Sequence, residues 1–310
     1  MQVRAGRRGK RHPAVRDEDS APARDEDSAP ADDSRPRERA GWFSRASTKV
    51  ACAAVLAAGV IVTLTPANGA AGNIASGFAR AVRHLVTTPP SQNGKDYSGA
   101  PAVGALFSTI GGKLHHHFCT ASVVNSPHGD IAITAAHCVS SLSSSIIVFV
   151  PGYDNGATPY GVWTVSAVYV DKSWSASADP DDDVAFLRVS QPGSIVPIED
   201  VTGAETLETG SSAHQLVQVI GYPDSSNQAI TCRNWTKQPM EDQLEFDCGG
   251  YTDGTSGGPF LAAVNLATGQ GTVIGVIGGY EQGGYTPAVS YSIMFGSNVA
   301  ALYRTAVAAG

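Results

Sequence analysis

The chain has 310 residues, of which 42% are hydrophobic, so it is long enough to bury one large or two small cores. Its formal net charge of −7 hides two regions, because residues 1–49 carry a net charge of +3 and residues 50–310 carry −10. A body this acidic argues against nucleic-acid binding, which needs a basic surface.

Residues 1–48 contain a tandem repeat of eight residues, in which RDEDSAPA at 16–23 recurs at 24–31. The segment is rich in Pro, Ala and charge and has almost no apolar content. It cannot bury enough surface to offset the entropy of ordering, so we expect it to be disordered and assign it no activity.

Residues 49–71 are predicted to be a signal peptide. The apolar stretch from Val50 to Leu64 covers 15 residues, whereas a membrane-spanning helix needs about 20. Basic residues precede this stretch and small residues follow it, as in secretory signals. We therefore expect a secreted, extracellular protein. The alternative is a single-pass anchor with the rest of the chain outside, so a membrane is a partner only if segment 50–64 stays uncleaved.

Residues 72–98 end in a cluster of Pro, Ser, Asn and Gly, which is typical of a linker or short propeptide. From residue 99 onward, short apolar or alternating runs recur between turn residues, and this pattern predicts an all-β domain over 99–310. The runs are VGALFSTI, CTASVV, IAITAA, SIIVFV, VWTVSAVYV, VAFLRV, LVQVIGY, LEFDC, GTVIGVIGGY and AVSYSIMF.

A C-terminal helix is predicted over residues 297–309, where the spacing of apolar residues is helical. Ser297 is the predicted N-cap. Val299, Leu302, Tyr303 and Val307 form one apolar stripe, which we interpret as packing.

Four cysteines follow the signal region: Cys119, Cys138, Cys232 and Cys248. An even number in an exported chain indicates two disulfides. Three pairings are possible, and we expect the local one, Cys119–Cys138 with Cys232–Cys248. No C-x-x-C spacing occurs, so we do not expect a metal site at these cysteines.

Ser256 is the candidate nucleophile, because GYTDGTSGGPFL places it on a glycine-rich turn that can present bare backbone N–H groups. A simple glycine-rich hairpin loop is the alternative. The pattern G-x-S-x-G also matches the nucleophile elbow of α/β-hydrolases, in which the histidine follows the serine. No histidine follows Ser256, so the base must come from earlier in the chain.

His137 is the candidate base, because IAITAAHCVS places it after an apolar strand and beside a cysteine. Asp183 is the candidate acid, because it directly precedes the buried run VAFLRV. Asp181 and Asp182 are interpreted as solvated turn residues. The histidines at 115–117 alternate between the two faces of a strand, which disfavours a metal site there.

Four motifs, HFCTASVV, TAAHC, DVAFL and GTSGGP, follow one another in the order found in chymotrypsin-like (trypsin-like) serine proteases. The chain resembles this family, and its overall sequence pattern, including residues 251–259, is most similar to that of the bacterial secreted members. The resemblance implies two six-stranded antiparallel β-barrels, about 99–195 and 205–295, with the active site between them. It also implies that Cys119–Cys138 brackets the histidine loop.

The same resemblance implies the residue roles. Ser256 would attack the scissile carbonyl, His137 would be the general base, and Asp183 would fix the imidazole tautomer. The backbone N–H groups of Gly254 and Ser256 would form the oxyanion hole. We expect a secreted serine endopeptidase that acts on proteins or peptides as a monomer, without cofactor, metal or nucleic acid. The alternatives are an inactive protease-like binding protein and an esterase with the same triad.

Two departures from the family pattern concern specificity and activation. Gly250 stands where trypsin-type enzymes carry an acidic residue, and the run VIGVIGGY lacks the histidine of glutamate-specific members. We expect Gly250, Tyr251, Gly275 and Gly278 to form a specificity pocket that favours neither Lys/Arg nor Glu. Thr255 replaces the aspartate that pairs with a newly cut N-terminus. Local hydrogen bonds should hold the turn instead, and activity should not depend on where between 73 and 98 the chain starts.

Overall fold

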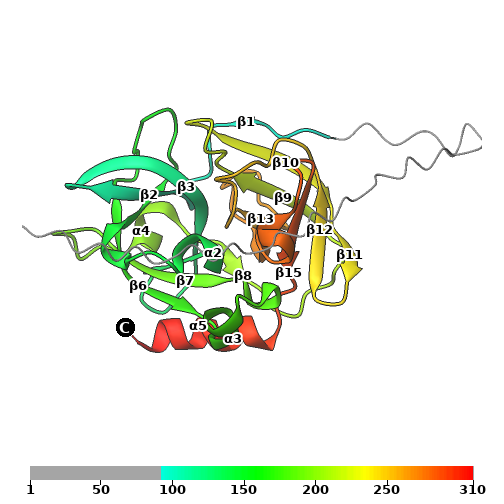
Figure 1. Cartoon of the computed structure of the whole chain (residues 1–310). Helices are drawn as coiled ribbons and strands as arrows, with labels where there is room; N and C mark the ends of the chain where they lie inside the picture. Colours follow the sequence, from blue (N-terminus) through cyan, green and yellow to red (C-terminus); the bar gives the residue numbers. More distant parts are fainter. Residues whose placement is uncertain (1–91, 310) are drawn as a thin grey trace, which may run out of the picture. The chain divides into compact units, whose positions relative to one another are not determined.

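The computed structural model describes residues 92–309, in which strands predominate (Figure 1). The predicted disordered region 1–48, the signal peptide 49–71 and residues 72–91 of the predicted linker lie outside the described residues. Within 92–309, the structure contains no helix long and apolar enough to cross a membrane.

The first half of the described chain is a closed antiparallel barrel, in the strand order β2-β3-β4-β7-β6-β5. Every residue of β4 and β5 is buried, because both faces of these strands pack into core clusters: Ile131, Ile133, Val148 and Val150 into one, and Ala132, Ile147 and Phe149 into another. The strands are β2 (Val103–Ile110), β3 (Lys113–Val124), β4 (Ile131–Thr134), β5 (Ile147–Pro151), β6 (Trp163–Val170) and β7 (Ala185–Ser190). This half confirms the predicted first barrel.

The second half consists of two sheets, one with the strand order β1-β10-β9-β13-β14-β8 and one with the order β11-β12-β15. Its strands are β1 (Lys95–Tyr97), β8 (Thr206–Leu207), β9 (Leu216–Gly221), β10 (Ala229–Trp235), β11 (Lys237–Met240), β12 (Gln243–Asp247), β13 (Pro259–Ala262), β14 (Thr272–Val276) and β15 (Val289–Ile293). Strand β1 lies within the segment that the sequence analysis interprets as a linker or propeptide.

Side chains bridge the two seams between these sheets: the Asn234 amide donates to the Asp247 carbonyl at 2.8 Å between β10 and β12, and Ser292 lies at the seam between β14 and β15. The Val276 N–H donates to the Ser292 hydroxyl at 2.9 Å, so a side chain replaces a ladder hydrogen bond. Gly275 permits this approach, because a Cβ there would lie 2.4 Å from Ser292 Oγ. Figure 1 shows the green barrel strands beside the yellow and orange strands of the second half.

The helices are short except for the last. They are α2 (Ala136–Val139), α3 (Lys172–Ser177), α4 (Ile198–Thr202) and α5 (Ser297–Ala308), with 3-10 helices η1 (Ser144–Ile146), η2 (Pro180–Asp182) and η3 (Tyr280–Gly283). The predicted C-terminal helix and its apolar stripe are confirmed, since Val299 and Leu302 are buried in the core. The predicted N-cap is wrong: the cap is Gly296, and no side chain caps the helix.

Direct hydrogen bonds join the two halves at β3. The Thr120 N–H donates to the Ser256 carbonyl at 2.7 Å. The Thr120 hydroxyl donates to the Gly254 carbonyl at 3.0 Å and accepts from the Tyr222 N–H at 2.9 Å. The glycine-rich turn around Ser256 is therefore held at the boundary between the first barrel and the second half.

Candidate active site

His137 lies on α2, the single helical turn that follows β4. The disulfide between Cys138 and Cys119 joins this turn to β3. His137 Nδ1 lies 2.7 Å from Asp183 Oδ2, and the His137 backbone N–H donates to Asp183 Oδ1 at 2.9 Å. The imidazole and the backbone of one residue are thus both fixed by the same carboxylate.

Asp183 directly follows η2, and one residue, Val184, separates it from β7. Its side chain has no exposure to solvent. A third hydrogen bond, from the Gly279 N–H at 2.9 Å, reaches Oδ2. A buried carboxylate is costly unless donors compensate it, and these three contacts supply that compensation.

Asp181 and Asp182 are not merely solvated turn residues, as the sequence analysis interprets them. The Gln243 side-chain amide donates to Asp181 Oδ1 at 2.6 Å, and the Asn298 amide donates to Asp182 Oδ1 at 2.9 Å. Gln243 belongs to β12 and Asn298 to α5, so two distant segments hold the turn that carries Asp183. No motif in the sequence indicates these two amides.

The turn around Ser256 requires its glycines. Gly254 and Gly257 have φ of +89° and +80°, which L side chains rarely adopt. A Cβ would lie 2.5 Å from the Asp224 nitrogen at position 254 and 2.1 Å from Thr134 Oγ1 at position 257. Ser256 is half-buried.

The N–H groups of Gly254 and Ser256 donate to no protein acceptor among the described residues. The sequence analysis predicts that these two groups form the oxyanion hole. No hydrogen bond joins Ser256 Oγ to His137 within residues 92–309, although both side chains line one hollow. Such contacts are often long in ligand-free sites and shorten when substrate binds.

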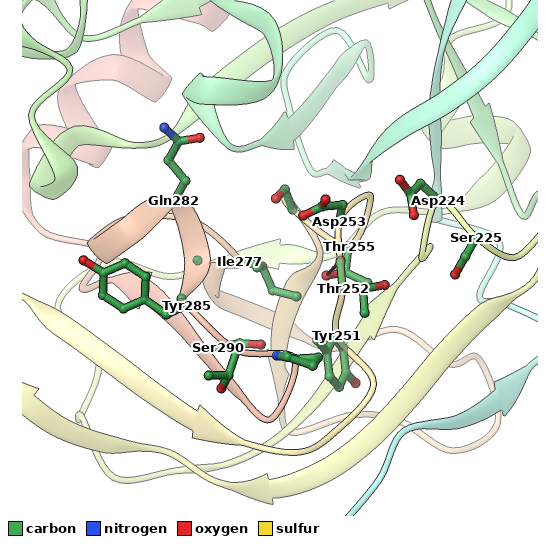
Figure 2. A pocket seen from close by; sticks show the side chains of 15 residues that line it. Asp224, Ser225, Tyr251, Thr252, Asp253, Thr255, Ile277, Gln282, Tyr285 and Ser290 are labelled. Carbon is green, nitrogen blue, oxygen red and sulfur yellow. Dashed lines mark hydrogen bonds between the residues drawn. The ribbon is translucent and has the colours of Figure 1, made fainter. Parts of the chain in front are cut away.

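Two hollows meet at Ser256. The first is a cavity of about 440 Å³, whose wall includes Tyr251, Thr255, Ile277 and Ser290. Figure 2 shows Gln282 and Tyr285 on one side of it and Asp224 and Ser225 on the other. The second, of about 430 Å³, is lined by His137, the Cys119–Cys138 disulfide, Gly254 and Gln282, among others.

Of the four residues predicted for the specificity pocket, only Tyr251 lines the larger cavity. The predictions for Gly250, Gly275 and Gly278 are corrected by their neighbours. Gly275 faces Ser292 at the sheet seam, Gly278 faces Asp183, and Gly250 faces Ile230 and Gly94. These glycines allow close packing behind the cavity and do not form its surface.

The cavity wall is held by local hydrogen bonds. The Tyr251 hydroxyl donates to the Val219 carbonyl at 2.8 Å, and burial raises the pKa of this phenol, so it stays neutral. The Thr255 hydroxyl donates to the Thr252 carbonyl at 2.7 Å. The local hydrogen bond predicted for Thr255 is confirmed.

Both predicted disulfides, Cys119–Cys138 and Cys232–Cys248, are present. Within residues 92–309, Cys119, His137 and Cys138 are grouped closely enough to suggest metal ligands. The two sulfurs are joined to each other, however, so they are not the thiolates that a metal binds.

The three histidines at 115–117 have different surroundings. His117 is buried, its Nε2 lies 2.9 Å from the Ser226 carbonyl, and burial lowers its pKa. His115 and His116 are exposed. The three rings therefore do not share one environment.

Comparison with known families assigns the chain to one of them. The model of the family described as Trypsin matches residues 91–294, which is more than half of the chain. The chain belongs to the trypsin family.

Solved structures agree with this assignment. The protease Anisep from Arthrobacter nicotinovorans is 25% identical over 69% of this chain and 99% of its own, with a TM-score of 0.59. A thermostable serine protease, AL20, from an extremophilic microorganism is 24% identical over 69% of this chain and 100% of its own, with a TM-score of 0.58. The second likeness concerns the fold alone.

A sequence relative named "Extracellular metalloprotease", from Bacillus subtilis (strain 168), is 29% identical over 109 residues. The match covers 34% of this chain and only 33% of that relative.

Proposed function

We propose that this trypsin-family protein is a secreted serine endopeptidase whose catalytic residues are His137, Asp183 and Ser256. The observation that carries the proposal is the contact of 2.7 Å between His137 Nδ1 and the buried Asp183, beside a hollow that His137 shares with Ser256. A nucleophile, a base and an orienting carboxylate in this relation are what acyl transfer needs.

The mechanism starts from the tautomer of His137. Because Nδ1–H donates to Asp183, the other ring nitrogen, Nε2, carries the lone pair and accepts the Ser256 proton. Ser256 Oγ then bonds to the substrate carbonyl carbon, and the N–H groups of Gly254 and Ser256 stabilise the oxyanion. His137 passes the proton to the leaving amine as the C–N bond breaks. A water molecule, deprotonated by His137, hydrolyses the acyl-enzyme and restores Ser256.

The proposed substrate side chain is uncharged. Tyr251, Ile277 and Ser290 form an uncharged part of the wall of the larger cavity, and neither hollow has a lysine or arginine among its described lining residues. Asp224 and Asp253 also line the larger cavity, and these carboxylates would repel an acidic side chain. Cleavage after Glu is therefore the least favoured.

Secretion is part of the proposal because the chain carries two disulfides, which persist in oxidising compartments. The predicted signal peptide at 49–71 would direct export, and an uncleaved segment would instead leave the domain anchored outside. Protein or peptide substrates and a monomeric state remain expectations.

The experiment compares wild type with Ser256→Ala, using a fluorophosphonate probe, a peptide library and a set of esters. The proposal expects labelling and peptide cleavage by wild type only. A wild-type protein that takes no label would identify the inactive binding protein. Ester hydrolysis without peptide cleavage would identify the esterase.

A further inference from the structure

We propose that Gln243 is a positioning residue, which fixes both the cavity wall and the carboxylate that orients His137. The inference rests on the proposed function and deepens it. Gln243 begins β12 and touches none of the three proposed catalytic residues. It acts through the turn before Asp183 and through the segment 279–285.

Gln243 is almost fully buried, with 3% exposure of the residue, and both ends of its side-chain amide are hydrogen bonded. Nε2 donates to Asp181 Oδ1 at 2.6 Å and lies 3.5 Å from the Pro180 carbonyl. Oε1 accepts from the Tyr280 N–H at 3.0 Å. Only this orientation works, because a carboxylate cannot donate and a backbone N–H cannot accept.

The two ends of the amide lead to the same carboxylate. On one side, Asp181 belongs to η2, the turn that delivers Asp183. On the other side, Tyr280 follows Gly279, whose N–H donates to Asp183 Oδ2 at 2.9 Å. Position 279 also requires glycine, because a Cβ there would lie 2.4 Å from Gln243 Oε1. Displacing Gln243 would therefore shift both the η2 turn before Asp183 and the Gly279 N–H that donates to Asp183.

Segment 279–285 lines both hollows, and part of it has an unfavourable backbone conformation. Glu281 and Gln282 are consecutive non-glycine residues in the left-handed region, with φ of 50° and 53°. Such residues persist only where the surrounding structure holds them, and they are concentrated at functional sites. The Gln243 bond to Tyr280 lies immediately before this pair. It is the anchor that keeps Gln282 at the wall of both hollows.

The test uses four variants. Gln243→Leu removes both hydrogen bonds at similar volume. Asp181→Ala removes the Nε2 partner at an exposed position, so folding is preserved, and Asp181→Asn keeps an acceptor oxygen there. Asn298→Ala is the matched control, because it removes the hydrogen bonds from Asn298 to Asp182 Oδ1 and to the Asp181 carbonyl, in the same turn, without touching segment 279–285.

Two readouts are needed: kcat and KM on a peptide substrate, and amide hydrogen exchange of residues 279–285. Gln243→Leu and Asp181→Ala should lower kcat/KM by about tenfold, with a rise in KM from the displaced cavity wall and a fall in kcat from the displaced Asp183. Exchange at Tyr280 should accelerate in both. A purely structural role would reduce the amount of active protein and lower apparent kcat at unchanged KM.

Asp181→Asn and Asn298→Ala should stay within about twofold of wild type, because both leave the Gln243 amide with an acceptor at position 181 and with its donor at Tyr280. The inference is overturned if Asp181→Ala matches wild type in KM and exchange, or if Asn298→Ala has the same effects. Exchange does not require activity. A wild type without peptidase activity would refute the proposed function, while the exchange data would still decide whether Gln243 anchors the segment.

Discussion

Glu205 is a buried carboxylate for which the proposed mechanism has no use, and it makes stability depend on pH. It lies between the two halves, where its N–H donates to the Val123 carbonyl at 2.9 Å. Oε2 accepts from the Gly271 N–H, while Oε1 is buried without a partner among the described residues. Burial raises the pKa of Glu205 from 4.5 to about 7, against the smaller, opposite effect of the Gly271 hydrogen bond.

The sign of the effect follows from this raised pKa. Below pH 4.5 both the folded and unfolded states hold the proton. Between 4.5 and about 7 the unfolded chain releases it first, so the free energy of unfolding falls as pH rises. Above about pH 7 Glu205 is ionised in both states, and the free energy of unfolding no longer changes with pH through this group. The difference between the two pKa values, at about 1.36 kcal/mol per pH unit, gives a total loss of about 3 kcal/mol.

Glu205→Gln removes this dependence because the amide stays neutral. Its oxygen can still accept from Gly271, and its NH₂ group takes the place of Oε1, where the protonated parent also buries a donor without a partner. The difference in unfolding free energy between variant and parent should therefore shift by about 3 kcal/mol in favour of Gln between pH 4.5 and pH 8.

The assay is urea unfolding followed by tryptophan fluorescence at several pH values, with Ser256→Ala in every protein to prevent self-cleavage. Asp200→Asn, at an exposed position of the adjacent helix α4, is the control for the loss of one acidic side chain. Parallel profiles for Glu205→Gln and its parent would refute the reasoning, because Glu205 would then titrate alike in both states.

Three further predictions concern the site. Asp183→Asn should lower kcat by about 10⁴-fold while the fold persists, because the amide favours the wrong imidazole tautomer; kinetics with a melting curve test this, and kcat within about tenfold of wild type contradicts it. Gly257→Ala should cost more than about 2 kcal/mol through strain and clash, whereas Gly111→Ala, with positive φ but open space, should cost about 1 kcal/mol; equal shifts in urea midpoint would remove the clash from the argument. Replacing Cys119 and Cys138 by Ala should cost about 2–4 kcal/mol and raise hydrogen exchange in α2; unchanged exchange there would show that the disulfide does not hold the histidine turn.

The local patterns of this sequence predict those parts of the fold in which one segment carries its own signal. VGALFSTI became β2 with the same bounds, and the helical spacing after residue 296 became α5. Strands β10 and β13 have no such signal. AITCRNW mixes polar and apolar residues irregularly, and PFLA is only four residues long after a glycine turn. Their pairing with β9 makes them strands, and that contact is not local in sequence.

The same distinction applies to the candidate site. His137, Asp183 and Ser256 stand in short motifs, so they could be identified without coordinates. Gln243 acts on residues 37 and 62 positions away, which no local pattern encodes. The pocket glycines were misplaced for a related reason. Sequence order indicates which segment forms a wall but not which side of that segment faces the cavity.

Residues 92–97 make hydrogen bonds that narrow the range of chain starts expected to be equally active. The Gly94 N–H donates to the Gly249 carbonyl and the Gly249 N–H donates to the Gln92 carbonyl, both at 2.7 Å. Strand β1 then pairs with β10 along Lys95–Tyr97. Gly249 is two residues before Tyr251, so this segment supports the cavity wall from behind. We therefore expect equal activity only for chains that start between residue 73 and about residue 90, and not over the whole range 73–98 expected from the sequence.

Chains starting at 73, 82 and 90 should have the same kcat/KM, because Thr255 offers no carboxylate to pair with a new α-ammonium group and its hydroxyl already holds the turn through Thr252. A chain starting at 98 loses β1 and the bonds to Gly249. At about 1 kcal/mol for each net hydrogen bond, it should lose a few kcal/mol of stability. Its KM should rise as the Gly249–Tyr251 wall loosens. Each start is also made with one added residue. Thermal melts on this series measure the loss of stability, and peptide kinetics measure the rise in KM. Activity confined to one start, and abolished by acetylating its amine, would mean that another carboxylate binds the new terminus; an unimpaired chain from 98 would mean that β1 does not support the wall.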